Sequence, residues 1–257
     1  MTRRMMVAGL TALASLLGSP GARVEASFTG FGTGAGFTLN GQMNGAPTIS
    51  GGVLTLTDGF GSETRSVFYN TAQAINRFTA QFTYQDVGGG GADGVAFVIQ
   101  NNPMGVTAGG VGGGSLGYGG LTQSVGVLLS LLNPTAGTGL GVNGSITSFG
   151  PSGAVAIPSG HQIRVNLGYD GTTLSETLLD LTTLQSFTTA YAVDIAGSIG
   201  SSTGYVGFTG ATGAGASTQQ ISNLSFTNAA VPEPASFLLL AVGAVGTWTL
   251  ARPRHQA

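Results

Sequence analysis

The span 27–230 consists of short runs with a side-chain period of two, and no stretch in it has the 3.6-residue period of a helix. In 78–84, for example, Phe78, Ala80, Phe82 and Tyr84 fall on one side of an extended chain. Glycine and asparagine separate these runs, and both residue types are frequent in turns. A strand that is apolar on one face must bury that face against another layer. The pattern therefore predicts an all-β domain, either a sandwich or a barrel.

The strongest strand patterns occur at regular intervals along this span. The expected strands are 53–57, 78–84, 94–100, 124–132, 162–169, 173–181, 205–209 and 221–226. The run 124–132 is almost continuously apolar, which is typical of a strand that is covered on both faces. We expect loops at the glycine-rich segments 87–91 and 105–120, and a core that contains the phenylalanines Phe31, Phe37, Phe68, Phe82, Phe97 and Phe208.

The N-terminal 26 residues have the organisation of a secretory signal peptide. Arg3 and Arg4 form a basic start, 5–17 is a short apolar segment, and small or aliphatic residues at Val24 and Ala26 suit a signal peptidase. We therefore expect cleavage just before Ser27. The domain to be folded is then 27–230, which is long enough to bury a sizeable core.

The C-terminus begins with Pro232, Glu233 and Pro234, which favour an extended and accessible peptide. The uncharged segment 235–251 follows, and as a helix it would reach about 25 Å, just short of the ~30 Å hydrocarbon core. Arg252 and Arg254 then follow, as expected at a cytoplasmic end. A plain C-terminal anchor helix is one interpretation.

Together, the motif, the apolar segment and the basic tail of 231–257 resemble the PEP-CTERM sorting signal of Gram-negative bacteria. The resemblance implies recognition by an exosortase-type enzyme and transient insertion of the helix in the inner membrane. It also implies that the helix is then removed and that the protein reaches the cell surface or the polysaccharide matrix.

Charge and cysteine content restrict the partners of the domain. The chain has no cysteine and no lysine. Arg65, Arg77 and Arg164 are the only arginines in 27–230, and aspartate and glutamate outnumber them there. Because nucleic-acid binding depends on positive charge, this composition argues against it. A surface of hydroxyl and amide side chains suits neutral hydroxylated partners, and it equally suits a plain matrix protein.

Several short motifs in a fixed order resemble the L-type (legume-type) lectin domain. They are Ser66-Val67-Phe68-Tyr69-Asn70, Gly91-Ala92-Asp93-Gly94-Val95-Ala96-Phe97, Gly113-Gly114-Ser115-Leu116-Gly117, Ser124-Val125-Gly126-Val127, Val165-Asn166-Leu167-Gly168-Tyr169-Asp170-Gly171, Val206-Gly207-Phe208-Thr209-Gly210-Ala211-Thr212-Gly213 and Ile221-Ser222-Asn223-Leu224-Ser225-Phe226. The resemblance covers 28–227 and implies a concanavalin A-like jelly-roll β-sandwich.

The resemblance also implies a sugar site. Asp93, preceded by a cis peptide bond, would accept hydrogen bonds from sugar hydroxyls. Gly113 or Gly114 would present a backbone N–H, and Asn133 would supply the third contact. The last loop of the site corresponds to Ala214 and Gly215, whose side chains offer almost nothing with which to select a sugar.

The metal-binding pattern of that family is altered in this chain. Where the family has ligand glutamate and aspartate on one strand, this chain has Leu128 and Ser130, and Thr138 and Gly139 stand where an Asp and a His are expected. Calcium prefers six to eight oxygen ligands, several of them charged. We therefore predict no metal and no other cofactor. Sugar binding, if retained, would be metal-independent or altered in specificity.

Three classes of function remain open. The first is carbohydrate binding to an extracellular polysaccharide or glycan, and the second is a structural or adhesive matrix role on the same scaffold without a sugar site. The third is a glycan-active enzyme, which needs paired carboxylates. Glu63 and Glu176 are the only glutamates in the domain, and neither has an acidic residue one or two positions away. His161 precedes a strand in a turn and is expected to be an exposed loop residue. We therefore predict that the protein is not an enzyme.

Overall fold

A computed structural model describes residues 27–228 except 90, 133–135 and 147. The strands are β1 Ser27–Thr29, β2 Phe37–Met43, β3 Thr48–Ser50, β4 Val53–Asp58, β5 Thr64–Tyr69, β6 Gln73–Ala74, β7 Phe78–Val87, β8 Gly94–Gln100, β9 Ser124–Ser130, β10 Gly137–Val142, β11 Ser145–Ile146, β12 Gln162–Tyr169, β13 Thr173–Asp180, β14 Ser186–Ala192, β15 Thr203–Ala211 and β16 Thr218–Asn228. The helices are α1 Ile195–Ile199 and the 3-10 turns η1 Gly105–Thr107, η2 Gly113–Ser115 and η3 Ile157–Ser159.

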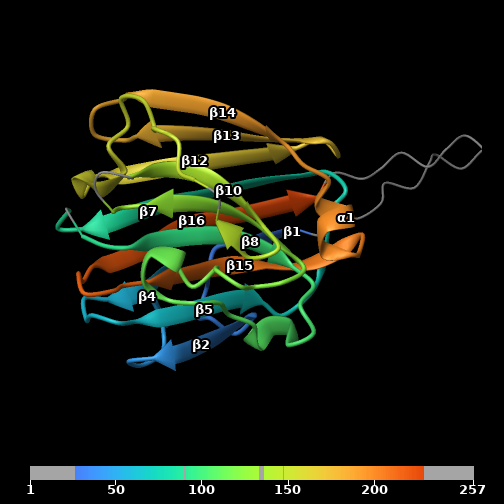
Figure 1. Ribbon diagram of the computed structural model, residues 1–257, viewed down its shortest axis with the longest axis horizontal. Helices are drawn as coiled ribbons and strands as arrows, with labels where there is room; N and C mark the ends of the chain where they lie inside the picture. The colour runs from blue at the N-terminus through green and yellow to red at the C-terminus, as the bar shows by residue number, and fades with distance from the viewer. Residues whose placement is uncertain (1–26, 90, 133–135, 147, 229–257) are drawn as a thin grey trace, which may run out of the picture.

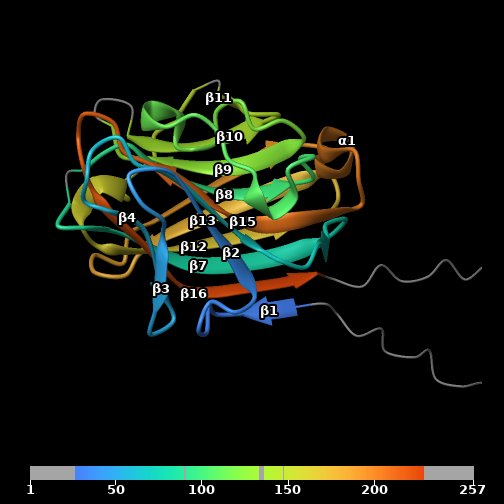
Figure 2. The same ribbon diagram turned by 90° about the horizontal axis from the view of Figure 1, so that it is seen from below.

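The strands form two antiparallel sheets packed face to face as two layers (Figures 1 and 2). The first sheet has the order β14-β13-β12-β7-β16-β4-β3, with β1 beside β16. The second has the order β11-β10-β9-β8-β15-β5-β2, with β6 beside β15. The chain crosses between the layers several times, for instance from β7 to β8 and from β15 to β16. This arrangement confirms the expected all-β jelly-roll sandwich.

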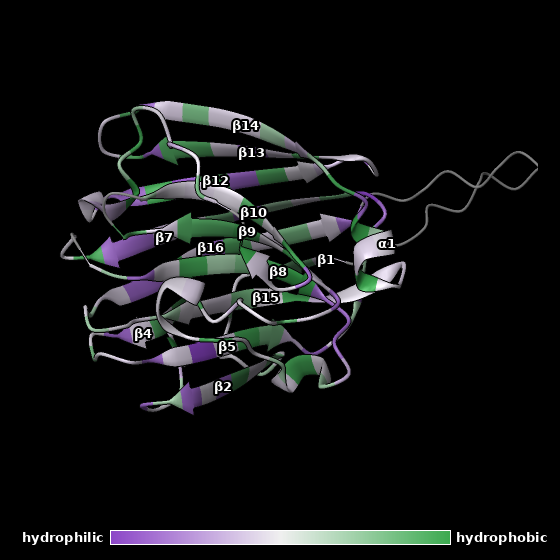
Figure 3. Ribbon diagram, in the orientation of Figure 1, coloured by the Kyte–Doolittle hydropathy of each residue, from purple (hydrophilic) through white to green (hydrophobic). Residues whose placement is uncertain are grey.

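Alternation along the strands explains why each sheet has an inner and an outer face. In β12 the inward residues Ile163, Val165 and Leu167 are buried, while the residues between them are partly exposed. Figure 3 shows that hydrophobic and hydrophilic residues alternate along most strands. Every residue of β9 is buried, which confirms the expectation that this strand is covered on both faces.

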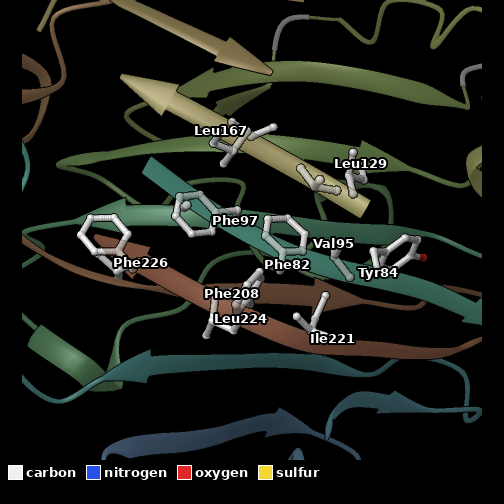
Figure 4. Packing of buried hydrophobic residues seen from close by; sticks show 14 of the residues in the cluster. Phe82, Tyr84, Val95, Phe97, Leu129, Leu167, Phe208, Ile221, Leu224 and Phe226 are labelled. Carbon is white, nitrogen blue, oxygen red and sulfur yellow. The ribbon is translucent and has the colours of Figure 1, made fainter. Parts of the chain in front are cut away.

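Aromatic side chains fill the space between the layers. Phe82 of one sheet meets Phe97 and Phe208 of the other, with ring centroids 5.8 and 5.0 Å apart (Figure 4). Burial of such a side chain contributes about 1.5–3 kcal/mol. The phenylalanines expected in the core are all buried. With no disulfide available, this packing holds the two layers together.

The short helix α1 was not expected from the sequence. Its N-cap is Asp194, whose carboxylate accepts a hydrogen bond from the Gly197 N–H at 2.8 Å, and Gly200 ends it in a left-handed conformation. Five residues are too few to show a helical period. Among the longer strands, β2 and β14, at edges of their sheets, and β5 and β10, inside the second sheet, were also not expected from the sequence.

The segment 105–120, expected to be a loop, contains two 3-10 turns, and a β-bridge between Val111 and Gly119 encloses the second of them. Within the described residues, no helix is long and apolar enough to span a membrane. The apolar segment 235–251 and the motif Pro232-Glu233-Pro234 lie outside the described residues, as does the expected signal peptide, 1–26.

Candidate functional site

Asp93 is held by its backbone at one end of the sandwich, immediately before β8. Its N–H donates to the Ala211 carbonyl at 3.0 Å, and its carbonyl accepts from the Leu131 N–H at 2.9 Å. The peptide bond between Ala92 and Asp93 is cis, as the resemblance implied. Asp93 is therefore fixed between the end of β15 and the chain that follows β9.

The carboxylate of Asp93 is buried and incompletely bonded. The residue is only 6% exposed, and its Oδ2 has no hydrogen-bond partner among the residues that the structure describes. Burial raises the pKa of this carboxyl group. Since buried polar groups are almost always hydrogen-bonded, an unpaired buried carboxylate oxygen is unusual and marks Asp93 as a candidate functional residue.

Glycines from two other loops surround this carboxylate. A β-carbon at Gly213 would lie 2.8 Å from Asp93 Oδ2, and one at Gly113 would lie 3.9 Å from the same atom. Gly113 also has a positive φ of 60°, which favours glycine. A β-carbon at Gly215 would lie 3.0 Å from the Ala92 side chain. The absence of side chains at these positions leaves backbone groups close to the carboxylate.

The structure therefore brings together some of the residues expected at the site. Asp93, Gly113 and Gly215 lie close together, whereas Gly114 faces open space and Ala214 is exposed on the same loop as Gly215. Asn133 lies outside the described residues. Gly213 was not expected at the site, although it ends the Ala211-Thr212-Gly213 motif that marks the last loop.

The loop that carries Gly213 is anchored on the connection between β4 and β5. The Thr212 N–H donates to the Glu63 carbonyl at 3.0 Å, and the Glu63 N–H donates to Thr212 Oγ1 at 2.9 Å. The Ser62 N–H donates to the Gly213 carbonyl at 2.8 Å. Figure 1 shows the β4–β5, β7–β8 and β15–β16 connections gathered at one end of the sandwich.

An ion-pair network lies beneath these loops. Arg65, buried in the sandwich, contacts the Glu63 carboxylate and the Asp58 carboxylate, the latter at 3.1 Å. Burial raises the pKa of Glu63 to about 7. Arg65 also donates to the Asn44 carbonyl at 2.6 Å. The network ties β4 and β5 together and supports the anchoring of the site loops.

The positions expected to bind metal in a lectin have other roles in this chain. Leu128 is fully buried in an apolar cluster with Phe68, Ala96 and Leu116. The Ser130 hydroxyl accepts from the Leu132 N–H at 3.3 Å, and Thr138 donates to the carboxylate of Glu176 at 2.8 Å. Among the described residues, no group of three or more His, Asp or Glu side chains could hold a metal ion.

The two remaining candidate groups, Glu176 and His161, have hydrogen-bond partners of their own. Glu176 is fully buried between the layers, where Thr138 and Tyr191 donate to it at 2.8 and 3.0 Å. His161 precedes β12, as expected, but its side chain is only 35% exposed and its Nδ1 lies 2.8 Å from Asp180 Oδ2. The bond to Asp180 fixes the loop before β12.

Comparison with known structures shows strong similarity to legume lectins. Lectin I-B4 from Griffonia simplicifolia, in a metal-free form, is 21% identical, with a TM-score of 0.67 over 80% of this chain and 100% of that chain. Arcelin-5, a lectin-like defense protein from Phaseolus vulgaris, is 19% identical, with a TM-score of 0.65 over 80% and 98%. The Bauhinia forficata lectin in complex with GalNAc is also 19% identical, with a TM-score of 0.65 over 80% and 99%. At identities this low, the structural similarity shows the fold alone.

Comparison of the sequence with curated proteins gives no match. The family model of the PEP-CTERM protein-sorting motif matches residues 230–254, which confirms the interpretation of the C-terminus as a sorting signal. The chain is therefore an exported protein, processed at the cell envelope, in which a domain with the legume-lectin fold precedes a PEP-CTERM protein-sorting motif.

Proposed function

We propose that this protein binds a carbohydrate at the end of the sandwich where Asp93 lies. The observation that carries the proposal is the buried Asp93 Oδ2, which has no hydrogen-bond partner in the described part of the chain and faces two glycine loops. A carboxylate accepts hydrogen bonds from hydroxyl donors, and such charge-assisted bonds are short and strong. Two adjacent sugar hydroxyls supply donors with the required spacing.

Backbone groups complete the proposed site. Gly113 and Gly114, both in η2, would offer N–H donors at close range because no β-carbon blocks the approach. Ala214 and Gly215 form the outer wall, and Asn133 is the proposed third polar contact. We propose that binding needs no metal, because Leu128 and Ser130 take the places of charged ligands and Leu128 is packed in an apolar cluster.

The sorting motif supports an extracellular glycan as the partner. In the proposed organisation, 1–26 is a signal peptide, 27–230 is the binding domain and 231–257 is the sorting segment. An exosortase-type enzyme would remove the C-terminal segment after its transient insertion in the inner membrane. The domain would then reside at the cell surface or in the polysaccharide matrix of a Gram-negative bacterium.

Binding to a glycan array and to purified extracellular polysaccharide tests this proposal. We expect the wild-type protein to bind equally with and without a chelator. Asp93→Asn should weaken binding at least about tenfold, because a hydrogen bond to a charged group contributes ~1.5–3 kcal/mol. Asp170→Asn is the matched control, because Asp170 is exposed in the β12–β13 turn at the opposite end of the sandwich.

Other outcomes have defined meanings. Binding that disappears with the chelator would contradict the metal-independent mechanism. Binding by Asp93→Asn as strong as that of the wild-type protein would show that the site lies elsewhere. An absence of binding to any glycan would favour a structural matrix role, for which the small residues Ala214 and Gly215 are the supporting observation. We expect no release of reducing sugar, because the carboxylates of both Glu63 and Glu176 are engaged inside the sandwich.

A further inference from the structure

Phe60, in the connection between β4 and β5, is 66% exposed and is the only exposed phenylalanine in the described part of the chain. The other phenylalanines in that part are buried or half-buried. A single exposed apolar side chain is ordinary on a protein surface. Phe60 differs because its backbone is fixed and because its neighbours belong to the proposed sugar site.

Four hydrogen bonds hold the short loop that carries Phe60. The Phe60 carbonyl accepts from Thr212 Oγ1 at 2.7 Å, and the Gly61 carbonyl accepts from Asn44 Nδ2 at 2.8 Å. After Phe60 in the chain, the Ser62 N–H donates to the Gly213 carbonyl. Before Phe60, the Asp58 N–H donates to the Glu63 carboxylate at 3.1 Å. The loop therefore presents its aromatic side chain from a fixed backbone, which limits the entropy lost when a ligand contacts the ring.

The loop lies directly against the residues that face Asp93. Thr212, which bonds the Phe60 carbonyl, precedes Gly213, and a β-carbon at Gly213 would lie 2.8 Å from Asp93 Oδ2. A β-carbon at Gly61 would lie 3.1 Å from the Gly213 carbonyl. A second exposed apolar residue, Val111, is 63% exposed and precedes the η2 turn that carries Gly113. Phe60 and Val111 are thus exposed apolar residues in loops that adjoin the glycines around the carboxylate.

The charges near these loops restrict the ligand further. Arg65, in the strand that follows the Phe60 loop, is buried and engaged by both Glu63 and Asp58. It is therefore not accessible to an anionic sugar. The Asp93 carboxylate would repel a second carboxylate such as that of a uronic acid.

We propose that Phe60 forms the apolar wall of the sugar site and that the site selects a neutral pyranose with an exposed C–H face. This inference rests on the proposed function: the ring hydroxyls donate to Asp93 while the C–H face packs on Phe60. An aromatic face with a polar acceptor beside it suits a ligand that has one apolar and one hydroxylated side.

Intrinsic fluorescence tests the proposal with simple sugars as the probes. The only tryptophan of the chain is Trp248, in the C-terminal segment. In a Trp248→Phe background, Phe60→Trp leaves a single indole at the proposed wall. Titration with galactose, glucose, mannose and N-acetylgalactosamine should shift and change its emission, and galacturonate should not. Equal responses to galacturonate would overturn the neutral-sugar assignment.

Binding by variants separates this inference from the proposed function. We expect Phe60→Ala to weaken neutral-glycan binding about tenfold. Met104→Ala is the matched control, because Met104 is 63% exposed and lies past the opposite end of β8. Circular dichroism of each variant checks the fold.

Full binding by Phe60→Ala, together with loss of binding by Asp93→Asn, would overturn the role of Phe60 and leave the proposed site intact. Full binding by both variants would place the sugar site elsewhere. No binding of any neutral glycan by the wild-type protein would refute both proposals.

Discussion

At the scale of single residues, the domain contains buried carboxylates in distinct environments. Asp93 has an unpaired oxygen, Glu63 faces Arg65, and Glu176 has only hydroxyl partners. Burial raises the pKa of Glu176 to about 7, because the hydrogen bonds from Thr138 and Tyr191 compensate only in part for the loss of water. Glu176 is therefore the residue from which a pH dependence of stability is most directly expected.

We predict that Glu176→Gln reduces the loss of stability that the wild-type protein shows as pH rises. A folded-state pKa above the unfolded value of 4.5 means that the native protein binds the proton more tightly. The stabilisation from this group is complete below about pH 4.5 and is lost as pH rises to about 7. A shift of this size corresponds to about 3 kcal/mol.

Urea unfolding of wild type and variant at pH 5 and pH 8 measures this effect. Relative to the wild-type protein, the unfolding free energy of Glu176→Gln should increase from pH 5 to pH 8. Glu63 contributes in the same direction in both proteins, so its effect cancels in the comparison. Identical pH profiles for the two proteins would show that Glu176 does not titrate in this range.

At the scale of secondary-structure elements, the close approach of neighbouring strands depends on individual glycines. Gly207 in β15 is paired with Phe68 in β5. A β-carbon at Gly207 would collide with the backbone of Val67 and lie 2.7 Å from the Phe68 ring. Backbone atoms in the middle of a sheet have little room to move. The glycine is therefore required by the packing of β15 against β5.

We predict that Gly207→Ala lowers the free energy of unfolding by about 1–3 kcal/mol or more, as overpacking of a tight interior does. Gly114→Ala is the matched control, since Gly114 has no positive φ and a β-carbon there meets nothing within 4 Å. Thermal melts of the two variants should differ clearly. An unchanged melting temperature for Gly207→Ala would show that β5 and β15 can separate without cost.

Some secondary-structure elements could be predicted from the sequence pattern alone. The alternating run 162–169 and the continuous apolar run that contains β9 led to correct strands, because burial on one or both faces leaves a local record in the residue types. The helix α1 and the strand β14 were missed. α1 has five residues, and the inward side chains of β14 are only half-buried at the sheet edge.

At the scale of the whole molecule, the proposed site and the chain ends lie at opposite ends of the sandwich. Ser27 pairs with Thr227, so the first and last strands described leave the domain side by side. β16 begins at Thr218, next to the site loops, and ends at Asn228 after 11 residues, which as a strand span about 35 Å. A sorting segment attached after Asn228 therefore leaves the Asp93 end pointing away from its attachment.

We predict that replacement of Pro232, Glu233 and Pro234 by alanine prevents C-terminal processing, because the extended motif would be lost and the apolar segment retained. Mass spectrometry of the mature protein should show loss of the C-terminal segment in wild type and an intact C-terminus in the variant. Expression without an exosortase-type enzyme provides the control and should give an intact C-terminus in both. Normal processing of the alanine variant would contradict the role of the motif.

The sequence by itself determined the all-β class, the inward faces of the strongly alternating strands and the sorting signal, and it marked Asp93 as a candidate residue. These features depend on local patterns, because side-chain alternation and short motifs lie within a few residues of chain. Only the tertiary structure placed Gly213 beside Asp93, the Phe60 loop against Thr212, and Thr138 against Glu176. The first two contacts join segments that are far apart in the sequence, and the third forms only when the two layers close on each other, because β10 and β13 belong to different sheets.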